Sequence, residues 1–116
     1  MYIYFKDIHD YGVKYYHINP KKQKQIKHIV EGLPKWIEYL GVFGSSLRTT
    51  CREDSDIDII IIGEGDINEI NTYGYDVDIV HYKSLDDLIE SAERGLYSLE
   101  ANIIREGVFV YDKEHA

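Results

Sequence analysis

The stretch at residues 57–62 reads Ile-Asp-Ile-Ile-Ile-Ile, and it constrains the fold more than any other part of the chain. β-Branched residues favour strands, and a strand that is covered on both faces reads as a nearly continuous apolar run. Only Asp58 interrupts this one. We therefore predict a strand buried on both faces, near the centre of a sheet.

Less continuous apolar and aromatic stretches predict the other strands, at residues 36–43, 75–82 and 108–111. Asn19-Pro20 is typical of a helix cap followed by a first-turn proline, and Ser84 with Asp87 forms a second start signal. The predicted helices cover residues 20–33, 45–50 and 85–94. Beyond Gly95, a further helix is predicted that contains Leu96, Leu99 and Ile103 and ends at Gly107. The fold class is α/β (α+β), a small mixed sheet with flanking helices.

A chain of 116 residues suits one globular domain. We expect that domain over residues 19–116, preceded by a Tyr-rich hairpin or arm at residues 1–18. No apolar run is long enough to cross a membrane, and the first residues lack the layout of a signal peptide. Cys51 is the one cysteine, so no intrachain disulfide can form. These features favour the cytoplasm.

The formal net charge of −8 disfavours extended contacts with nucleic acid. Four lysines, however, cluster in the first predicted helix: Lys21, Lys22, Lys24 and Lys27. Such a cluster usually forms the solvated face of a helix, with a local anion site as the alternative.

Two carboxylates lie at the start of the isoleucine strand. Asp56 and Asp58 are two positions apart, so in extended chain they point to the same face. Two carboxylates on one face repel each other unless solvent or a cation lies between them. Mg²⁺ is typically bound by one or two carboxylates together with substrate phosphates. The pair predicts a metal site that a nucleoside triphosphate completes.

Asp78 repeats the apolar-Asp-apolar pattern in the next predicted strand, between Val77 and Ile79. If the two strands pair, the three carboxylates converge, as two-metal nucleotidyl transfer requires. Asp76 is the competing candidate. We favour Asp78 because its apolar neighbours are expected to bury it as Ile57 and Ile59 bury Asp58.

Gly44-Ser45 supplies a turn for phosphates. Glycine lets the backbone approach a phosphate closely, and a serine at a helix start offers a hydroxyl beside free N–H groups. The turn is therefore expected to hold the triphosphate.

The ordered set of Gly44, Ser45, Arg48, Ser55, Asp56 and Asp58 resembles the signature of the polymerase-β-like nucleotidyltransferases, closest to the minimal nucleotidyltransferases. The strand around Asp78 and the segment at residues 103–112 resemble later parts of that family. The resemblance implies nucleotide binding by Gly44, Ser45, Arg48 and Ser55. It also implies catalysis and metal binding by Asp56, Asp58 and Asp78. Leu47 and Thr49 stand where the family has alanine and glycine, which places the rate and the nucleotide fit in question.

By resemblance, the chain is expected to transfer AMP from ATP, with Mg²⁺, to a hydroxyl group. Because this length leaves no room for the added domain of larger relatives, either a second copy or another protein must complete the site. The family implies a tyrosine of a HEPN-type toxin as acceptor, hence an antitoxin role. The alternative is a non-catalytic module that neutralises its partner by contact.

Arg48 could equally pair with Glu53 or Asp54, and neither Cys51 nor His81 is expected in the site.

Overall fold

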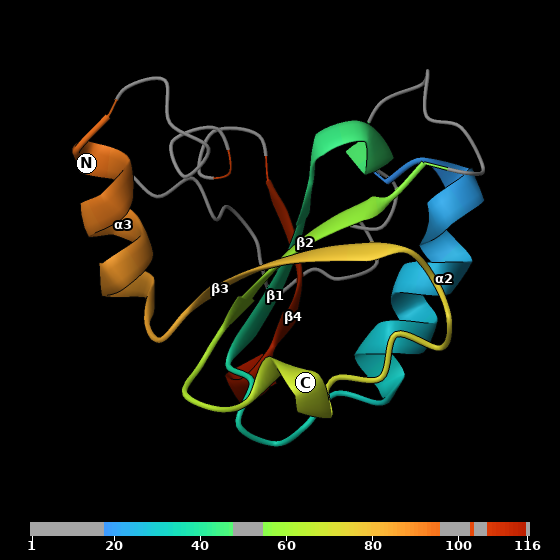
Figure 1. The fold of residues 1–116 in the computed structure, drawn as a ribbon, viewed down its shortest axis with the longest axis horizontal. Coiled ribbons are helices and arrows are strands. Elements are labelled where there is room, and N and C mark those ends of the chain that lie inside the picture. The colour runs from blue at the N-terminus through green and yellow to red at the C-terminus, as the bar shows by residue number, and fades with distance from the viewer. Residues whose placement is uncertain (1–17, 48–54, 96–102, 104–106, 116) are drawn as a thin grey trace.

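The computed structural model describes residues 18–47, 55–95, 103 and 107–115 (Figure 1). In chain order the longer elements are α2 (Pro20–Glu31), β1 (Tyr39–Phe43), β2 (Ile57–Ile62), β3 (Val77–Tyr82), α3 (Leu85–Glu93) and β4 (Val108–Asp112). Three short 3₁₀ turns accompany them: η1 (Gly44–Leu47), η2 (Ile67–Glu69) and η3 (Lys113–His115). The helices among them are too short or too polar to span a membrane.

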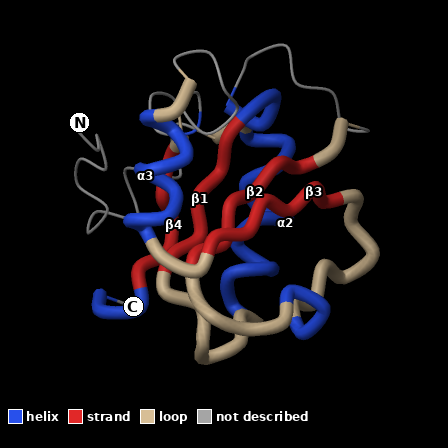
Figure 2. Tube along the Cα trace, turned by 60° about the vertical axis from the view of Figure 1, so that its left-hand side comes forward, coloured by secondary structure: helices blue, strands red, loops and turns tan. Residues whose placement is uncertain are grey.

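The four strands form one mixed sheet in the order β3-β2-β1-β4. β2 runs parallel to β3, whereas β1 is antiparallel to both β2 and β4. α2 and α3 lie on opposite faces of this sheet (Figure 2). The predicted α/β class with a small mixed sheet and flanking helices is confirmed.

Strand β2 is the buried centre of the sheet, as the isoleucine run predicts. Its five isoleucines have no exposed surface. Ile57, Ile59 and Ile61 pack with Ile26 and Ile29 of α2, whereas Ile60 and Ile62 pack with the α3 side. Because side chains alternate along a strand, β2 contributes side chains to two separate apolar cores, one on each face of the sheet.

Helix α2 begins where the Asn-Pro signal places it. The Asn19 side chain accepts a hydrogen bond from the backbone N–H of Lys21, and Gly32 follows the last turn. The expectation that all four lysines are solvated is wrong for Lys22, which is 2% exposed. Position 22 lies four residues before Ile26 and therefore continues the apolar stripe of the helix.

Several predicted boundaries move. The first strand begins at Tyr39 rather than at residue 36, because residues 34–37 form a turn closed by the Ile37 N–H on the Pro34 carbonyl. The helix predicted at 45–50 is the 3₁₀ turn η1, as far as residue 47. Residues 1–17 of the Tyr-rich arm and most of the helix predicted between Gly95 and Gly107 lie outside the described residues.

Gly41 in β1 is required by the packing of the α3 side. A Cβ atom there would lie 2.9 Å from Cγ2 of Ile60 and 3.1 Å from Cζ of Phe109. Since both side chains are fully buried, neither has solvent to move into.

Gly41→Ala is therefore expected to lower the free energy of unfolding by about 1–3 kcal/mol through overpacking. Urea denaturation measures this. The double variant Gly41→Ala with Phe109→Leu should lose less free energy of unfolding than the sum of the two single variants, because leucine lacks the ring atoms that the new Cβ would contact. Strict additivity of the two substitutions would contradict the contact as the cause.

Candidate functional site

Asp58 and Asp78 are brought together by the parallel pairing of β2 with β3. The register sets Asp58 directly beside Asp78, just as Ile57 lies beside Val77. Neighbouring strands lie about 5 Å apart, and paired residues of a parallel register point to the same face. That face is the α3 side, because Ile60 and Ile62 of the same parity pack against Leu88 and Ala92.

Asp78 lies in register but is exposed, so the expectation that its neighbours bury it is wrong. β3 is an edge strand and has a neighbour on one side only. Asp76 lies two residues earlier, just before β3 begins. Its backbone carbonyl accepts a hydrogen bond from the Ile57 N–H at 2.9 Å. The pairing thus sets Asp78, and not Asp76, beside Asp58.

Asp56 precedes β2 and is exposed, yet it affects Asp58 electrostatically. Burial, and then the nearby carboxylates of Asp78 and Asp56, raise the pKa of the Asp58 carboxyl above its usual value. Asp58 itself is only half-buried. The three aspartates chosen from the sequence therefore form one region of negative potential.

Gly44 closes this region from the end of β1. Its backbone has φ of +74°, a left-handed conformation that favours glycine. A Cβ atom at Gly44 would collide with the Asp58 carboxylate. Phe43 is the register partner of Asp58, so the turn begins directly beside the carboxylate. The sequence predicts that Gly44 lets the backbone approach a phosphate. In the structure, its missing side chain makes room for the Asp58 carboxylate.

The two serines after Gly44 have different environments. Ser45 is half-exposed, whereas Ser46 is fully buried and its hydroxyl has no hydrogen-bond partner among the described residues. The Ser46 carbonyl accepts a hydrogen bond from Asn19 N–H at 2.6 Å. Ser46 therefore ties η1 to the start of α2 and leaves Ser45 available at the surface. Sequence alone gives no sign of which serine faces inward.

The remaining candidates are less defined. Ser55 is half-buried just before Asp56, and Arg48 lies outside the described residues, as do Cys51 and Thr49. Leu47 packs against the core on the α2 side, which gives that departure from the family pattern a structural role. His81 Nε2 donates a hydrogen bond to the Gly63 carbonyl oxygen, 2.7 Å away. The position of His81 in β3 alternates to the face opposite Asp78.

The donor set suits a hard divalent cation. Within the described residues, no group of three or more His, Cys, Asp or Glu side chains forms a ready-made metal site. Mg²⁺, however, commonly takes one or two carboxylates and completes its shell with water and phosphate oxygens. Asp58 and Asp78 offer such a pair, and mutual repulsion at Asp58 is what a cation would relieve.

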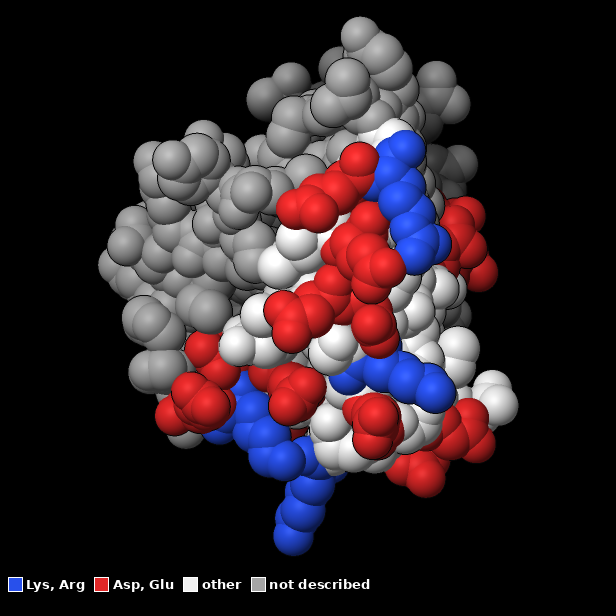
Figure 3. Space-filling view, turned by 90° about the vertical axis from the view of Figure 1, so that its left-hand side faces the viewer, with Lys and Arg blue, Asp and Glu red and all other residues white. Residues whose placement is uncertain are grey.

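The surroundings reinforce the need for cations. Acidic side chains gather on the face that carries α3 (Figure 3). The exposed acidic residues of that helix are Asp86, Asp87, Glu90 and Glu93. An anionic triphosphate approaching this face is repelled unless positive ions accompany it.

Comparison with known proteins gives a family match. The family described as "Polymerase beta, Nucleotidyltransferase" matches residues 24–116, which includes β1, the Gly44 turn, all three aspartates and β4. No curated protein and no solved structure matches the chain.

Proposed function

The chain belongs to the polymerase beta nucleotidyltransferase family, and from that membership we propose that it transfers AMP from ATP to a hydroxyl group of a partner protein. The observation that carries the proposal is the register of Asp58 with Asp78 beside the Gly44 turn. Two oxygen donors on neighbouring strands, next to a backbone turn without a side chain, suit a metal-bound triphosphate.

In this proposal Asp56 and Asp58 bind Mg²⁺, and Asp78 completes the site. The cations, when bound, neutralise charge on the phosphates and on the departing pyrophosphate. Gly44 and Ser45 hold the triphosphate through backbone N–H groups and a hydroxyl, with Arg48 and Ser55 supporting the loop. The roles of Gly44 and Asp78 follow from their residue types and from their places beside Asp58, and those of Arg48 and Ser55 follow from the family resemblance.

The reaction needs one proton acceptor. The acceptor oxygen attacks the α-phosphorus of ATP in line with the bond to the bridging oxygen. That bond breaks, pyrophosphate leaves, and the proton of the attacking hydroxyl passes to a carboxylate. Asp78 is our candidate for this base, because it is exposed to an incoming acceptor while Asp58 is half-buried.

For the acceptor we propose a tyrosine of a HEPN-type toxin, which gives the chain an antitoxin role. The support is the resemblance of the Gly44–Asp58 segment to the minimal nucleotidyltransferases. A second copy of this chain is the alternative partner that could complete the nucleotide site.

The choice of Asp78 over Asp76 is tested by a matched pair, Asp78→Asn and Asp76→Asn. Both changes remove one exposed negative charge at constant size and lie two positions apart. Calorimetric titration with Mg²⁺-ATP should show at least about tenfold weaker binding for Asp78→Asn and nearly wild-type binding for Asp76→Asn. The reverse order would assign the role to Asp76. If the wild type binds no Mg²⁺-ATP even with its partner present, the chain is instead a module that acts by contact alone.

A further inference from the structure

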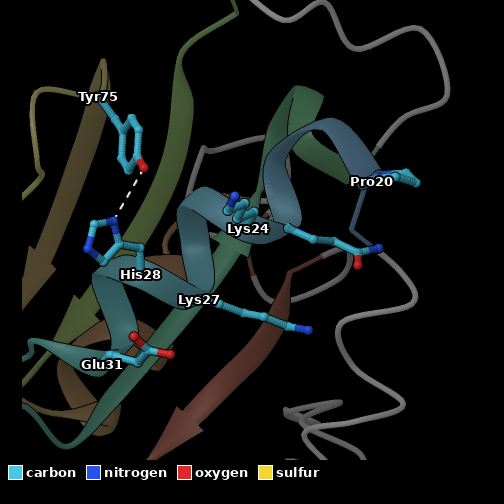
Figure 4. Close-up of a pocket in the computed structure, with 7 residues that line it drawn as sticks. Pro20, Lys24, Lys27, His28, Glu31 and Tyr75 are labelled. Atoms are coloured by element: carbon cyan, nitrogen blue, oxygen red, sulfur yellow. Dashed lines mark hydrogen bonds between the residues drawn. The ribbon is translucent and has the colours of Figure 1, made fainter.

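Helix α2 borders an open groove on the side of the sheet opposite to the aspartates. The groove encloses about 550 Å³ (Figure 4). Its walls are Tyr75 and one face of the helix, from Pro20 to Glu31. Ile26 and Ile29 of that helix pack with the odd-numbered isoleucines of β2, whereas Asp58 points to the other face. A ligand in this groove therefore leaves the aspartates accessible.

The groove lies along a face of α2 that does not pack into the apolar core. Positions 20, 24, 27 and 31 are spaced by three and four residues, so they align along the helix. The buried stripe of α2 contains Ile26 and Ile29 instead. Occupying the groove would thus leave the packing of α2 unchanged.

Aromatic rings give this surface a fixed shape at the end of the helix. The His28 ring stacks on Tyr73 with centroids 3.7 Å apart and planes 17° from parallel. Nδ1 of His28 also lies 3.3 Å from the Tyr75 hydroxyl. A side chain at Gly32 would collide with the Tyr73 hydroxyl, so the glycine allows the ring to lie across the helix. Rigid aromatic groups of this kind contribute contact area at little entropic cost.

The charge of the groove is opposite to that of the molecule. Lys24 and Lys27 lie along it, with Glu31 at the far end, whereas the whole chain carries −8. A basic groove beside aromatic rings attracts negatively charged ligands. A long nucleic acid would have to extend past the acidic remainder of the surface, whereas a short acidic peptide fits within the groove.

We propose that the α2 groove binds an extended acidic segment of a partner protein. Glutamate or aspartate side chains would pair with Lys24 and Lys27, and the chain of the segment would pack against His28 and Tyr75. The helix has 12 residues, so the groove is about 18 Å long and accommodates about six extended residues. This second site is independent of the proposed transfer reaction and requires neither ATP nor metal.

The test uses a fluorescein-labelled peptide of about six glutamate and aspartate residues, added to the full chain without ATP or Mg²⁺. Fluorescence anisotropy should show a dissociation constant of about 0.1 mM that weakens several-fold between about 50 and 300 mM NaCl. The double substitution Lys24→Glu with Lys27→Glu should weaken binding by at least about tenfold.

The matched control is Lys83→Glu with Lys113→Glu, which changes the net charge equally at two exposed lysines outside the groove. It should change the affinity by less than about twofold. His28→Ala, which alters no lysine, should weaken binding several-fold. This variant tests the groove independently if the double lysine variant fails to fold. Circular dichroism checks each fold.

Equal effects of the groove and control variants would overturn the proposal, as would absence of binding at low salt. Tighter binding of an oligouridylate than of the peptide would also overturn it and assign the groove to nucleic acid. Because the assay contains no nucleotide, Mg²⁺-ATP titration of the same samples reports separately on the proposed transferase site.

Discussion

Asp58→Asn is expected to lower the rate of AMP transfer by at least about 100-fold, since stabilisation of the transferred phosphate by a bound cation is worth several kcal/mol. Asparagine keeps the size of the side chain but loses the charge beside Asp78. Labelled AMP from α-³²P-ATP, followed onto proteins of an extract, measures the rate. Mg²⁺-ATP affinity by calorimetry should fall in parallel.

The same substitution is expected to stabilise the metal-free protein. The raised pKa of Asp58 means that its ionised form is disfavoured in the fold, first by burial and then by Asp78 and Asp56. Removing that charge should raise the free energy of unfolding by about 0.5–1 kcal/mol, a modest gain because the group is half-buried. A melting temperature higher by about 2–6 °C in EDTA would report it.

The sign of the pH dependence follows from the same shift. A carboxyl whose pKa is higher in the folded state takes up protons on folding, so its destabilising effect is present above the folded pKa. That effect disappears as the pH falls below the pKa of the unfolded chain. The stability difference between Asp58→Asn and wild type should therefore shrink on acidification.

Glu64→Gln is the matched control for Asp58→Asn, because it removes one exposed charge in the loop after β2. It should leave both transfer and melting temperature nearly unchanged. Full activity of Asp58→Asn, or a loss of stability in EDTA, would contradict the site described above.

Gly44→Ala is expected to reduce Mg²⁺-ATP binding and AMP transfer by about 100-fold, because a displacement of about 1 Å at a reacting group has effects of that size. The added Cβ collides with the Asp58 carboxylate, which must then leave its present position beside Asp78. Alanine at φ of +74° also costs about 1 kcal/mol of stability.

Gly74→Ala separates these two effects. Gly74 has φ of +79°, nearly that of Gly44, but a Cβ atom there would contact nothing within 4 Å. Both alanine variants should therefore lose similar stability in thermal melts, whereas only Gly44→Ala should lose nucleotide binding. Equal loss of binding in both variants would show that the contact with Asp58 is not the cause.

Much of the fold could be predicted because local signals agree with the tertiary structure. The isoleucine run of β2 has β-branched residues on both faces, and only a central strand can bury them all. Asn19 and Ser84 begin helices because their side chains accept from backbone N–H groups two or three residues on. The first strand was predicted too long because apolar residues such as Ile37 are also buried in turns.

The candidate site was predictable only in part. Asp56, Asp58 and Asp78 stand out as charges within or next to apolar strands, a local contrast that any reader of the sequence can see. Whether Asp78 or Asp76 accompanies Asp58 depends on the register of β2 with β3, and a shift by one residue would have turned the side chains to the other face. The exposure of Asp78 likewise depends on the place of β3 at the edge of the sheet.

The sequence by itself therefore determined the four strands apart from the start of the first, and where α2 and α3 begin. It also singled out three carboxylates as candidates to bind a metal. Only the tertiary structure decided the rest. It set Gly44 against Asp58, turned Ser46 inward while leaving Ser45 outside, buried Lys22, and opened the basic groove of α2 on the opposite face. The physical reason is that periodicity and capping act within a few residues, whereas strand register and the packing of a turn against a strand join residues distant in the chain.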